Sequence, residues 1–294
     1  MLYLARANSS LPYRCDLSQG ESVPMGKDRV SMENLQLAHR YLSGFEVGEQ
    51  YRAERDAYLD AHLRRLLITQ QMMPCLSAED RVLELGAAPY LMTLLLRHSG
   101  KFDLYTADYR GDGCSAEFSV LLHNPASGES CMLVCQNFNV EKDRFPYPDE
   151  FFDGLLCCEL LEHLASDPTH MLMEAHRVLR GGGWILITTP NVLVLRNLTT
   201  LAIKRKNIYA PYSGYGVYGR HNREWTLEEV VQLLKGCGFC IETAQQVDTY
   251  PHPFLSAALK KLFPHLRDMI FILARTGNEC TAYYPENLYT AMHN

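Results

Sequence analysis

The sequence has no apolar run of about 18 residues, the length that a membrane-spanning helix needs. Its first residues, MLYLARANSSLPYRC, have no apolar core of the kind found in secretory signals. These absences favour a cytosolic protein with no membrane span. Basic residues are not in excess either, since the formal net charge is −6, and this disfavours nucleic acid as a partner.

Cysteine does not form a compact framework in this chain. The 10 cysteines are scattered, and most lie in apolar stretches such as GLLCCEL, which predicts buried, reduced thiols. Cys237 and Cys240 alone have the spacing of a metal-binding pair. Without a second pair they are a weak zinc signal.

What the sequence does contain is an alternation of strands and helices. Two amphipathic helices are predicted first, from Ser31 to about residue 42 and over residues 49–73, after an irregular arm over residues 1–30. The predicted strands that follow are DRVLEL, KFDLYTADYRG, CMLVCQNFN, FFDGLLCCEL, GGGWILITTP, CIETAQQV and MIFILAR. This order predicts an α/β fold with a doubly wound, mostly parallel, Rossmann-like sheet and a ligand at the carboxyl ends of its strands.

Acidic side chains near the first strand turn point to a nucleoside ligand. Gly86 is the only glycine in LELGAAPY, so the GxGxxG pattern is missing, which disfavours pyrophosphate binding and a nicotinamide dehydrogenase. Glu84 precedes the turn, and Asp108 ends the second predicted strand. A carboxylate at the second position suits two ribose hydroxyls. The plain alternative is a pair of surface carboxylates at strand ends.

Residues 80–239 resemble the class I S-adenosylmethionine-dependent methyltransferases. The resemblance rests on VLELGAAP, YTADY, FPYPDEFFDGLLCCELLEHL and MLMEAHRVLRGGGWILITTPN, in that order. It implies S-adenosylmethionine as the cofactor. The implied cofactor contacts are Glu84, Gly86 and Ala87 for the methionine part, Asp108 for the ribose and Asn139 for the adenine edge.

On this resemblance residues 1–75 would be a cap or lid, and residues 76–294 the methyltransferase domain with a substrate-side insertion at 191–225. Two positions depart from the family pattern: GAAPY replaces GxGxG, and Asn139 stands where Asp is usual. Proline is permitted in the first turn of a helix, and Asn still hydrogen-bonds an amino group, so cofactor binding is expected.

The stretch CCELLEHL follows the fourth predicted strand. On a helix Glu159, Glu162 and His163 would share one face. Their oxygen and nitrogen atoms are ligands for a divalent ion such as Mg, Mn or Zn, which lowers the pKa of a bound hydroxyl. Without a metal these residues would orient the turn, and a histidine could act as general base.

The ExxEH pattern resembles that of the small-RNA terminal 2'-O-methyltransferases and of the O-methyltransferases of ubiquinone synthesis. The first group also carries a histidine before EWT, as His221 does here. The resemblance implies a metal shell of Glu159, Glu162, His163 and His221. His163 and His221 are also the candidate catalytic residues, and Glu159 is a further candidate contact of the cofactor.

We therefore predict O-methylation of a hydroxyl on a small-molecule or glycan acceptor, by a monomer or a homodimer. Residues 209–226 resemble those of bacterial methyltransferases linked to surface-polysaccharide synthesis, and this favours a sugar. Two alternatives stay open. A terminal-ribose RNA 2'-O-methyltransferase would need a basic channel, and a non-catalytic methyltransferase-like binding module would explain the missing glycines.

Overall fold

The computed structural model describes residues 30–46, 52–100, 102–208, 212–213, 216–250, 254–277, 284–285 and 288–289. Apart from its last residue, the arm predicted over residues 1–30 lies outside this part of the chain. None of the described helices is both long and apolar enough to cross a membrane.

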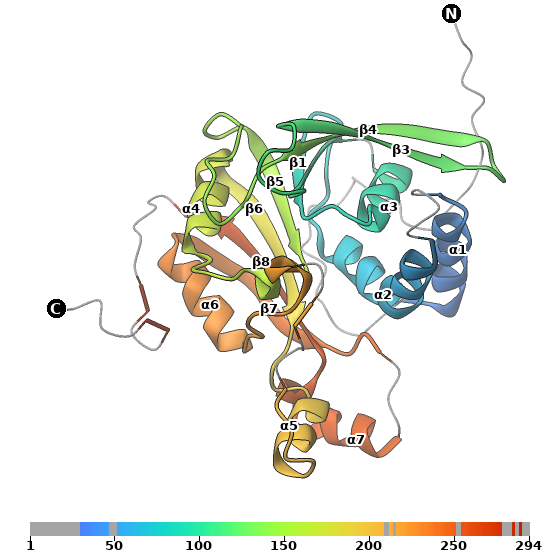
Figure 1. The fold of residues 1–294 in the computed structure, drawn as a ribbon. Helices are drawn as coiled ribbons and strands as arrows, with labels where there is room; N and C mark the ends of the chain where they lie inside the picture. The colour runs from blue at the N-terminus through green and yellow to red at the C-terminus, as the bar shows by residue number, and fades with distance from the viewer. Residues whose placement is uncertain are drawn as a thin grey trace, which may run out of the picture.

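An eight-stranded sheet runs through the molecule in the order β3-β4-β2-β1-β5-β6-β8-β7 (Figure 1). Its strands are β1 Arg81–Leu85, β2 Asp103–Asp108, β3 Glu117–Asn124, β4 Glu129–Asn137, β5 Phe152–Cys158, β6 Leu179–Pro190, β7 Phe239–Val247 and β8 Met269–Thr276. The neighbours from β4 to β6 are parallel, and the outer pairs are antiparallel. The predicted doubly wound, mostly parallel sheet is confirmed.

Helices cover both faces of this sheet (Figure 1). On one face lie α1 Met32–Ser43, α2 Arg52–Met72 and α3 Leu91–Ser99; on the other lie α4 Thr169–Val178 and α6 Leu227–Gly236. Leu156 and Leu186 join the core under α1 to α3, whereas Leu155 and Ile185 join the core under α4 and α6. Strands buried on both faces need such apolar runs, and this explains GLLCC and WILIT.

Helix caps set the direction in which the chain enters two of these helices. The predicted cap at Ser31 is confirmed, because its hydroxyl accepts a hydrogen bond of 3.1 Å from the Asn34 backbone amide. α6 begins with a capping box in which Thr226 and Glu229 each bond the backbone amide of the other. Such boxes satisfy amides that helix starts leave without partners. The capping box of α6 fixes where residues 220–225 enter the domain.

Three elements were missed by the sequence analysis. β3 forms an antiparallel hairpin with β4, α5 Leu195–Ala202 lies in the 191–225 insertion, and α7 Phe254–Leu262 follows β7. The alternation of β3 was hidden because Leu121, on the outer face of the hairpin, is apolar and exposed, as are Met132 and Val134 on β4. An exposed apolar residue removes the polar half of a period of two.

The prediction of buried cysteines is wrong in part. All eight cysteines in the described residues are free thiols, but Cys75, Cys114 and Cys240 are exposed. Cysteine is a small apolar residue that often packs in cores, so the apolar stretches around it suggested burial for all of them.

Gly154 on β5 lies against Trp184 on β6, its partner in the register. A methyl group at this position would overlap the indole ring. We expect Gly154→Ala to lower the free energy of unfolding by about 1–3 kcal/mol, the usual cost of overpacking a core. Urea denaturation measures this loss. The matched control is Gly181→Ala on β6, where the methyl group meets no atom within 4 Å; equal losses in both variants would contradict the packing argument.

Candidate functional site

The turn after β1 forms the floor of the candidate site. Gly86 has φ +64°, a left-handed conformation that glycine adopts without a steric cost. A Cβ at Gly86 would lie 3.3 Å from Cδ1 of Leu160, so this turn packs against the turn that follows β5. The backbone amide of Ala87, which is buried, donates a bond of 3.1 Å to the Ala107 carbonyl. The two turns thus meet at the carboxyl edge of the sheet.

Two carboxyl groups line this edge. Glu84 is buried, and its Oε2 accepts a hydrogen bond of 2.6 Å from the Thr93 hydroxyl. Burial raises the pKa of Glu84 to about 8, with a smaller contribution from the charge of Asp108. Burial also raises the pKa of Asp108, at the end of β2. A ligand with cationic or hydrogen-bond donor groups would favour the ionised forms of both.

Asn139 lies just beyond β4 and is buried. Its Nδ2 donates a hydrogen bond of 2.9 Å to the Tyr218 hydroxyl, and its Oδ1 accepts one of 2.9 Å from the Glu141 amide. The backbone amide of Asn139 donates to Asp143 Oδ2 at 2.7 Å. The side-chain amide therefore joins the loop after β4 to the insertion that carries Tyr218.

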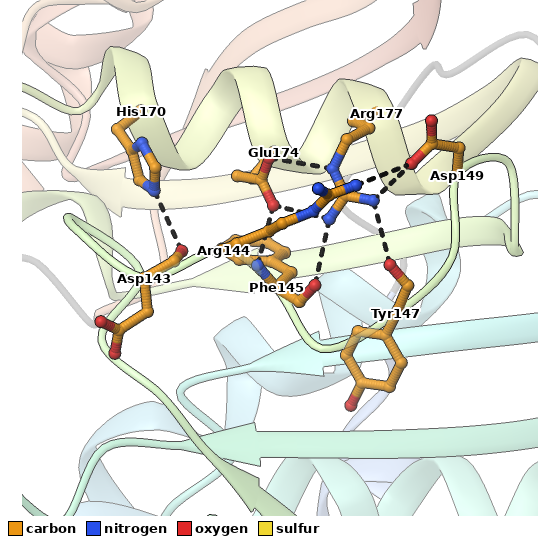
Figure 2. Close-up of polar contacts among 8 residues, drawn as sticks. All are labelled: Asp143, Arg144, Phe145, Tyr147, Asp149, His170, Glu174 and Arg177. Atoms are coloured by element: carbon orange, nitrogen blue, oxygen red, sulfur yellow. Dashed lines mark hydrogen bonds and ion pairs between the residues drawn. The ribbon is translucent and has the colours of Figure 1, made fainter.

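The loop that begins at Asn139 is fastened to α4 (Figure 2). Arg177 donates hydrogen bonds of 3.0 Å to the carbonyls of Phe145 and Tyr147. Glu174 accepts the Phe145 amide at 2.8 Å, and His170 donates to the Asp143 carbonyl at 3.0 Å (Figure 2). These bonds hold residues 143–147 against α4, and the Asn139 amide bonds Asp143 in turn, so Asn139 is linked to α4 through this loop.

The stretch CCELLEHL does not form the helix on which its residues would share one face. Only a 3₁₀ turn, η2 Leu161–His163, is present. Glu159 has φ +52°, so it directs its side chain away from a helical path. Its backbone amide donates to the Thr188 carbonyl at 2.9 Å, and its Oε1 accepts the Thr188 hydroxyl at 3.1 Å. A left-handed residue at this position is strained, and such residues concentrate at functional sites.

Glu162, His163 and His221 come together at this turn. Their candidate ligand atoms all lie within 4.8 Å of one another, and the two imidazole rings are 5.0 Å apart, edge to face. Glu159, the other predicted ligand, is not in this group; its Oε2 lies 3.8 Å from Nε of Arg65 on α2. The structure thus assembles three of the four predicted metal-shell residues.

Backbone hydrogen bonds bring His221 to the turn. The Glu162 carbonyl accepts the amides of Asn222 and Arg223 at 2.7 and 3.3 Å. Asn222 also donates from its side chain to the His163 carbonyl at 2.8 Å. These contacts hold residues 222–223 against residues 162–163. They therefore place the preceding residue, His221, beside the turn.

The hydrogen bonds of the two rings define which nitrogen is available to a ligand. His163 Nδ1 lies 3.0 Å from the Arg220 carbonyl, and His221 Nδ1 lies 3.2 Å from Glu224 Oε1. Because those oxygens accept, both Nδ1 atoms donate and the lone pairs reside on Nε2. Burial and the charge of His221 lower the pKa of His163, although the Arg220 and Tyr218 carbonyls oppose this. His163 is therefore neutral near pH 7.

Glu162 supplies the oxygen of the cluster. It is fully buried, and its Oε2 accepts the Thr189 hydroxyl at 3.0 Å. Its Oε1 has no hydrogen-bond partner among the described residues. Burial, and then the charge of Glu159, raise the pKa of Glu162 well above its usual value. A buried oxygen with no partner beside two imidazoles, each held by an acceptor, fits a divalent ion.

Arg65 was not predicted as a site residue, and the contacts of Tyr218 with Asn139 and of Glu224 with His221 were not foreseen from the sequence. Arg65 is fully buried on α2, and its Nε has no hydrogen-bond partner in the described part of the chain. The signal was a polar stripe on an otherwise apolar helix face, since Tyr58, His62 and Arg65 recur at i, i+4 and i+7. Tyr218 had no such signal, because only the folded insertion brings it to Asn139.

Comparisons with known proteins agree with this geometry. The model of a family described as a methyltransferase domain matches residues 51–244. A relative from Mycolicibacterium smegmatis, named as a probable S-adenosylmethionine-dependent methyltransferase, is 32% identical over 97 residues. That match covers 33% of this chain and 32% of the relative, so it spans about a third of the relative's length.

A solved structure from Haloferax volcanii is similar in fold. It is a complex between the Trm112 methyltransferase activator and the putative methyltransferase, with 13% sequence identity and a TM-score of 0.53. The match covers 82% of this chain and 98% of that one. At this identity the likeness concerns the fold alone.

Glu84 makes stability depend on pH. Because its pKa is raised from 4.5 to about 8 in the folded state, its contribution is full below pH 4.5 and is lost as the pH rises towards 8. We expect Glu84→Gln to reduce the decline in stability between pH 5 and 8, which amounts to on the order of 1.4 kcal/mol per pH unit for such a group.

Urea midpoints at both pH values, measured for the parent protein and the variant, test this expectation. Glu79→Gln at an exposed position is the control. Parallel pH profiles for the parent and Glu84→Gln would show that the folded state does not hold a proton on Glu84.

Proposed function

This chain belongs to the methyltransferase-domain family and is an S-adenosylmethionine-dependent methyltransferase, and from that premise we propose that it methylates a hydroxyl of a sugar or another small-molecule acceptor. The observation that carries the proposal is the cluster of Glu162, His163 and His221. Leu160, three residues from His163, touches the Gly86 turn, so the cluster lies beside the turn where the cofactor would bind.

The cofactor contacts follow the geometry of the carboxyl edge. Glu84 would face the methionine part, together with the backbone of Gly86 and Ala87. Asp108 would accept the ribose hydroxyls, because it ends the second strand of the parallel sheet. Asn139 would contact adenine through the amide that now donates to Tyr218. Glu159 is a further candidate contact, since it directly follows β5, the strand next to β1.

A divalent ion fits the donor set of the cluster. One carboxylate oxygen and two imidazole nitrogens favour Mn or Zn over Mg, which prefers oxygen ligands. Such an ion would lower the pKa of an acceptor hydroxyl. Glu162, His163 and His221 would hold it, and Glu159 would complete the shell only if its carboxylate turned from Arg65 and Thr188.

The transfer itself needs an oriented nucleophile. The acceptor oxygen attacks the methyl carbon of the sulfonium, the carbon–sulfur bond breaks, and S-adenosylhomocysteine leaves with the electron pair. Without an ion, the hydroxyl proton would pass to Nε2 of His163 or His221, whose Nδ1 atoms already donate to fixed acceptors. With an ion held by those nitrogens, the acidified hydroxyl would lose its proton to solvent instead. Correct placement of the two substrates can supply much of the rate.

The RNA alternative has little support in the charges near the cluster. Arg223 pairs with Glu229 at 2.8 Å and lies over the Trp225 ring. Arg220 donates to Asn222 and lies over the Tyr212 ring. Phosphate binding needs basic side chains along a track, whereas these guanidinium groups already have partners within the protein.

Titration calorimetry with S-adenosylhomocysteine separates the enzyme from a non-catalytic module. We expect binding in protein stripped by a chelator and also after Mn or Zn is restored, since Glu84, Gly86, Ala87, Asp108 and Asn139 take no part in the cluster. No heat in either state would overturn the methyl-transfer proposal and favour a module without cofactor.

His221→Ala tests the metal. We expect metal occupancy, measured by elemental analysis, and methyl transfer to fall together by at least about tenfold, with S-adenosylhomocysteine affinity within about twofold of the parent. His123→Ala on the β3–β4 hairpin is the control. Full turnover in chelator-treated parent protein would remove the metal from the mechanism and leave the histidines as bases.

A further inference from the structure

Three ring side chains from two distant segments come together near the candidate site. Tyr58 and His62 lie one turn apart on α2, with ring centroids 4.2 Å apart. Tyr250, from the segment after β7, places its hydroxyl 3.3 Å from His62 Nδ1, with the rings 6.0 Å apart. We call Tyr58, His62 and Tyr250 the aromatic ledge. All three rings are partly exposed.

Buried charged groups hold both sides of the ledge. The Tyr58 hydroxyl accepts a hydrogen bond of 2.6 Å from Arg65, whose side chain is only 2% exposed. On the other side, Asp268 accepts the backbone amides of Thr249 and Tyr250, both at 3.0 Å. Lys260 in turn donates to Asp268 at 2.6 Å. A binding surface whose side chains are already held in place loses less entropy when a ligand arrives.

The ledge lies close to the reactive cluster. Arg65, which holds Tyr58, is also the residue that lies 3.8 Å from Glu159. Burial, and then the charges of Arg65 and His221, lower the pKa of His62 to about 4, so His62 is neutral at pH 7 and close to His221. Burial and the charge of Glu159 raise the pKa of Tyr250 to about 12. The ledge therefore offers three neutral rings next to an acidic and imidazole-rich floor.

A cavity continues from one end of the ledge. It has a volume of about 1190 Å³ and lies between α1, α2 and residues 248–250. Tyr250 and Ala61, the neighbour of His62, both line it, together with polar groups such as Gln36 and Asp60. Its volume exceeds the roughly 300–1,000 Å³ of ordinary ligand sites, so a ligand on the ledge has room to extend away from the cluster.

We propose that the aromatic ledge binds the acceptor and that the acceptor is a pyranose sugar, whose C–H face stacks on Tyr58 and Tyr250 while its hydroxyls point to Glu159, His163 and His221. The inference rests on the proposed function and adds the residues that select the acceptor. Uncharged rings suit the apolar face of a sugar. Carboxylate and imidazole groups suit its hydroxyls.

Ligand-observed saturation-transfer NMR tests the proposal. The protein is loaded with S-adenosylhomocysteine and with Zn, and no Mn is added. The probes are methyl β-D-glucopyranoside, methyl α-D-mannopyranoside and methyl α-L-rhamnopyranoside, with catechol as a planar comparator. We expect transfer to the ring C–H protons of at least one glycoside. Transfer to catechol alone, or to no probe, would overturn the sugar assignment.

The variants are Tyr250→Leu, which removes the ring, and Tyr250→Phe, which keeps it. For the glycoside that binds, we expect Tyr250→Leu to weaken binding about tenfold, the effect of losing one good ring contact, and Tyr250→Phe to restore it. With that glycoside as methyl acceptor, KM should rise by the same factor while kcat changes less. Tyr250 is preferred to Tyr58, because removing Tyr58 would leave buried Arg65 without its acceptor.

Binding of S-adenosylhomocysteine is measured in every variant and distinguishes the two ways of failing. If the parent and both variants bind it equally but Tyr250→Leu keeps full glycoside affinity, the ledge is wrong and the proposed function stands. If none of them binds it, the proposed function fails and the ledge loses its reactive partner.

Discussion

The hydrogen bonds that join the turn after β5 to residues 222–223 are the constraint on which the candidate site depends. The Glu162 carbonyl accepts two amides from the insertion, and Asn222 reaches back to the His163 carbonyl. A main-chain carbonyl buried at this depth must have partners. The insertion supplies them, and in doing so it places His221 beside Glu162 and His163. The cluster is thus brought together by the hydrogen bonds that buried backbone carbonyls require.

A second constraint comes from the charges buried between α2 and the sheet. Arg65 is fully buried, which lowers the pKa of its guanidinium, yet the charge of Glu159 holds that pKa above its usual value. Such a pair is a weak source of stability, because removing two charges from water offsets much of their attraction. It does orient its partners: Arg65 holds Tyr58 and Glu159 at once, so the N-terminal helices and the floor of the site share one anchor.

Much of the fold could be predicted from the sequence, because strands buried on both faces leave long apolar runs. WILIT and GLLCC are such runs, and the Gly86 turn between a strand and a helix is equally plain. β3 could not be recognised from alternation, since its outer face carries Leu121, exposed and apolar. The residue types of the cluster of Glu162, His163 and His221 could also be predicted. Their arrangement could not, because φ +52° at Glu159 separates residues that an ideal helix would align.

Some site residues could not be predicted from any sequence pattern, because tertiary contacts alone define their surroundings. Tyr250 belongs to the ledge because Asp268 and Lys260 hold the backbone of its segment. Tyr218 meets Asn139 across 79 positions of sequence. Local propensity carries no information about contacts at such separations, and specificity commonly resides in connecting segments of this kind.

The bond between Asn139 and Tyr218 also has a thermodynamic consequence. Tyr218 follows Val217, whose carbonyl accepts a hydrogen bond from the same Asn222 side chain that binds His163. An adenine that accepted a hydrogen bond from the Asn139 amide would break the bond to Tyr218. This change could then be transmitted through residues 217–222 to the segment that carries His221. Linkage is reciprocal: if this change alters the affinity of the cluster for its ligand, that ligand changes the affinity for the nucleoside by the same factor.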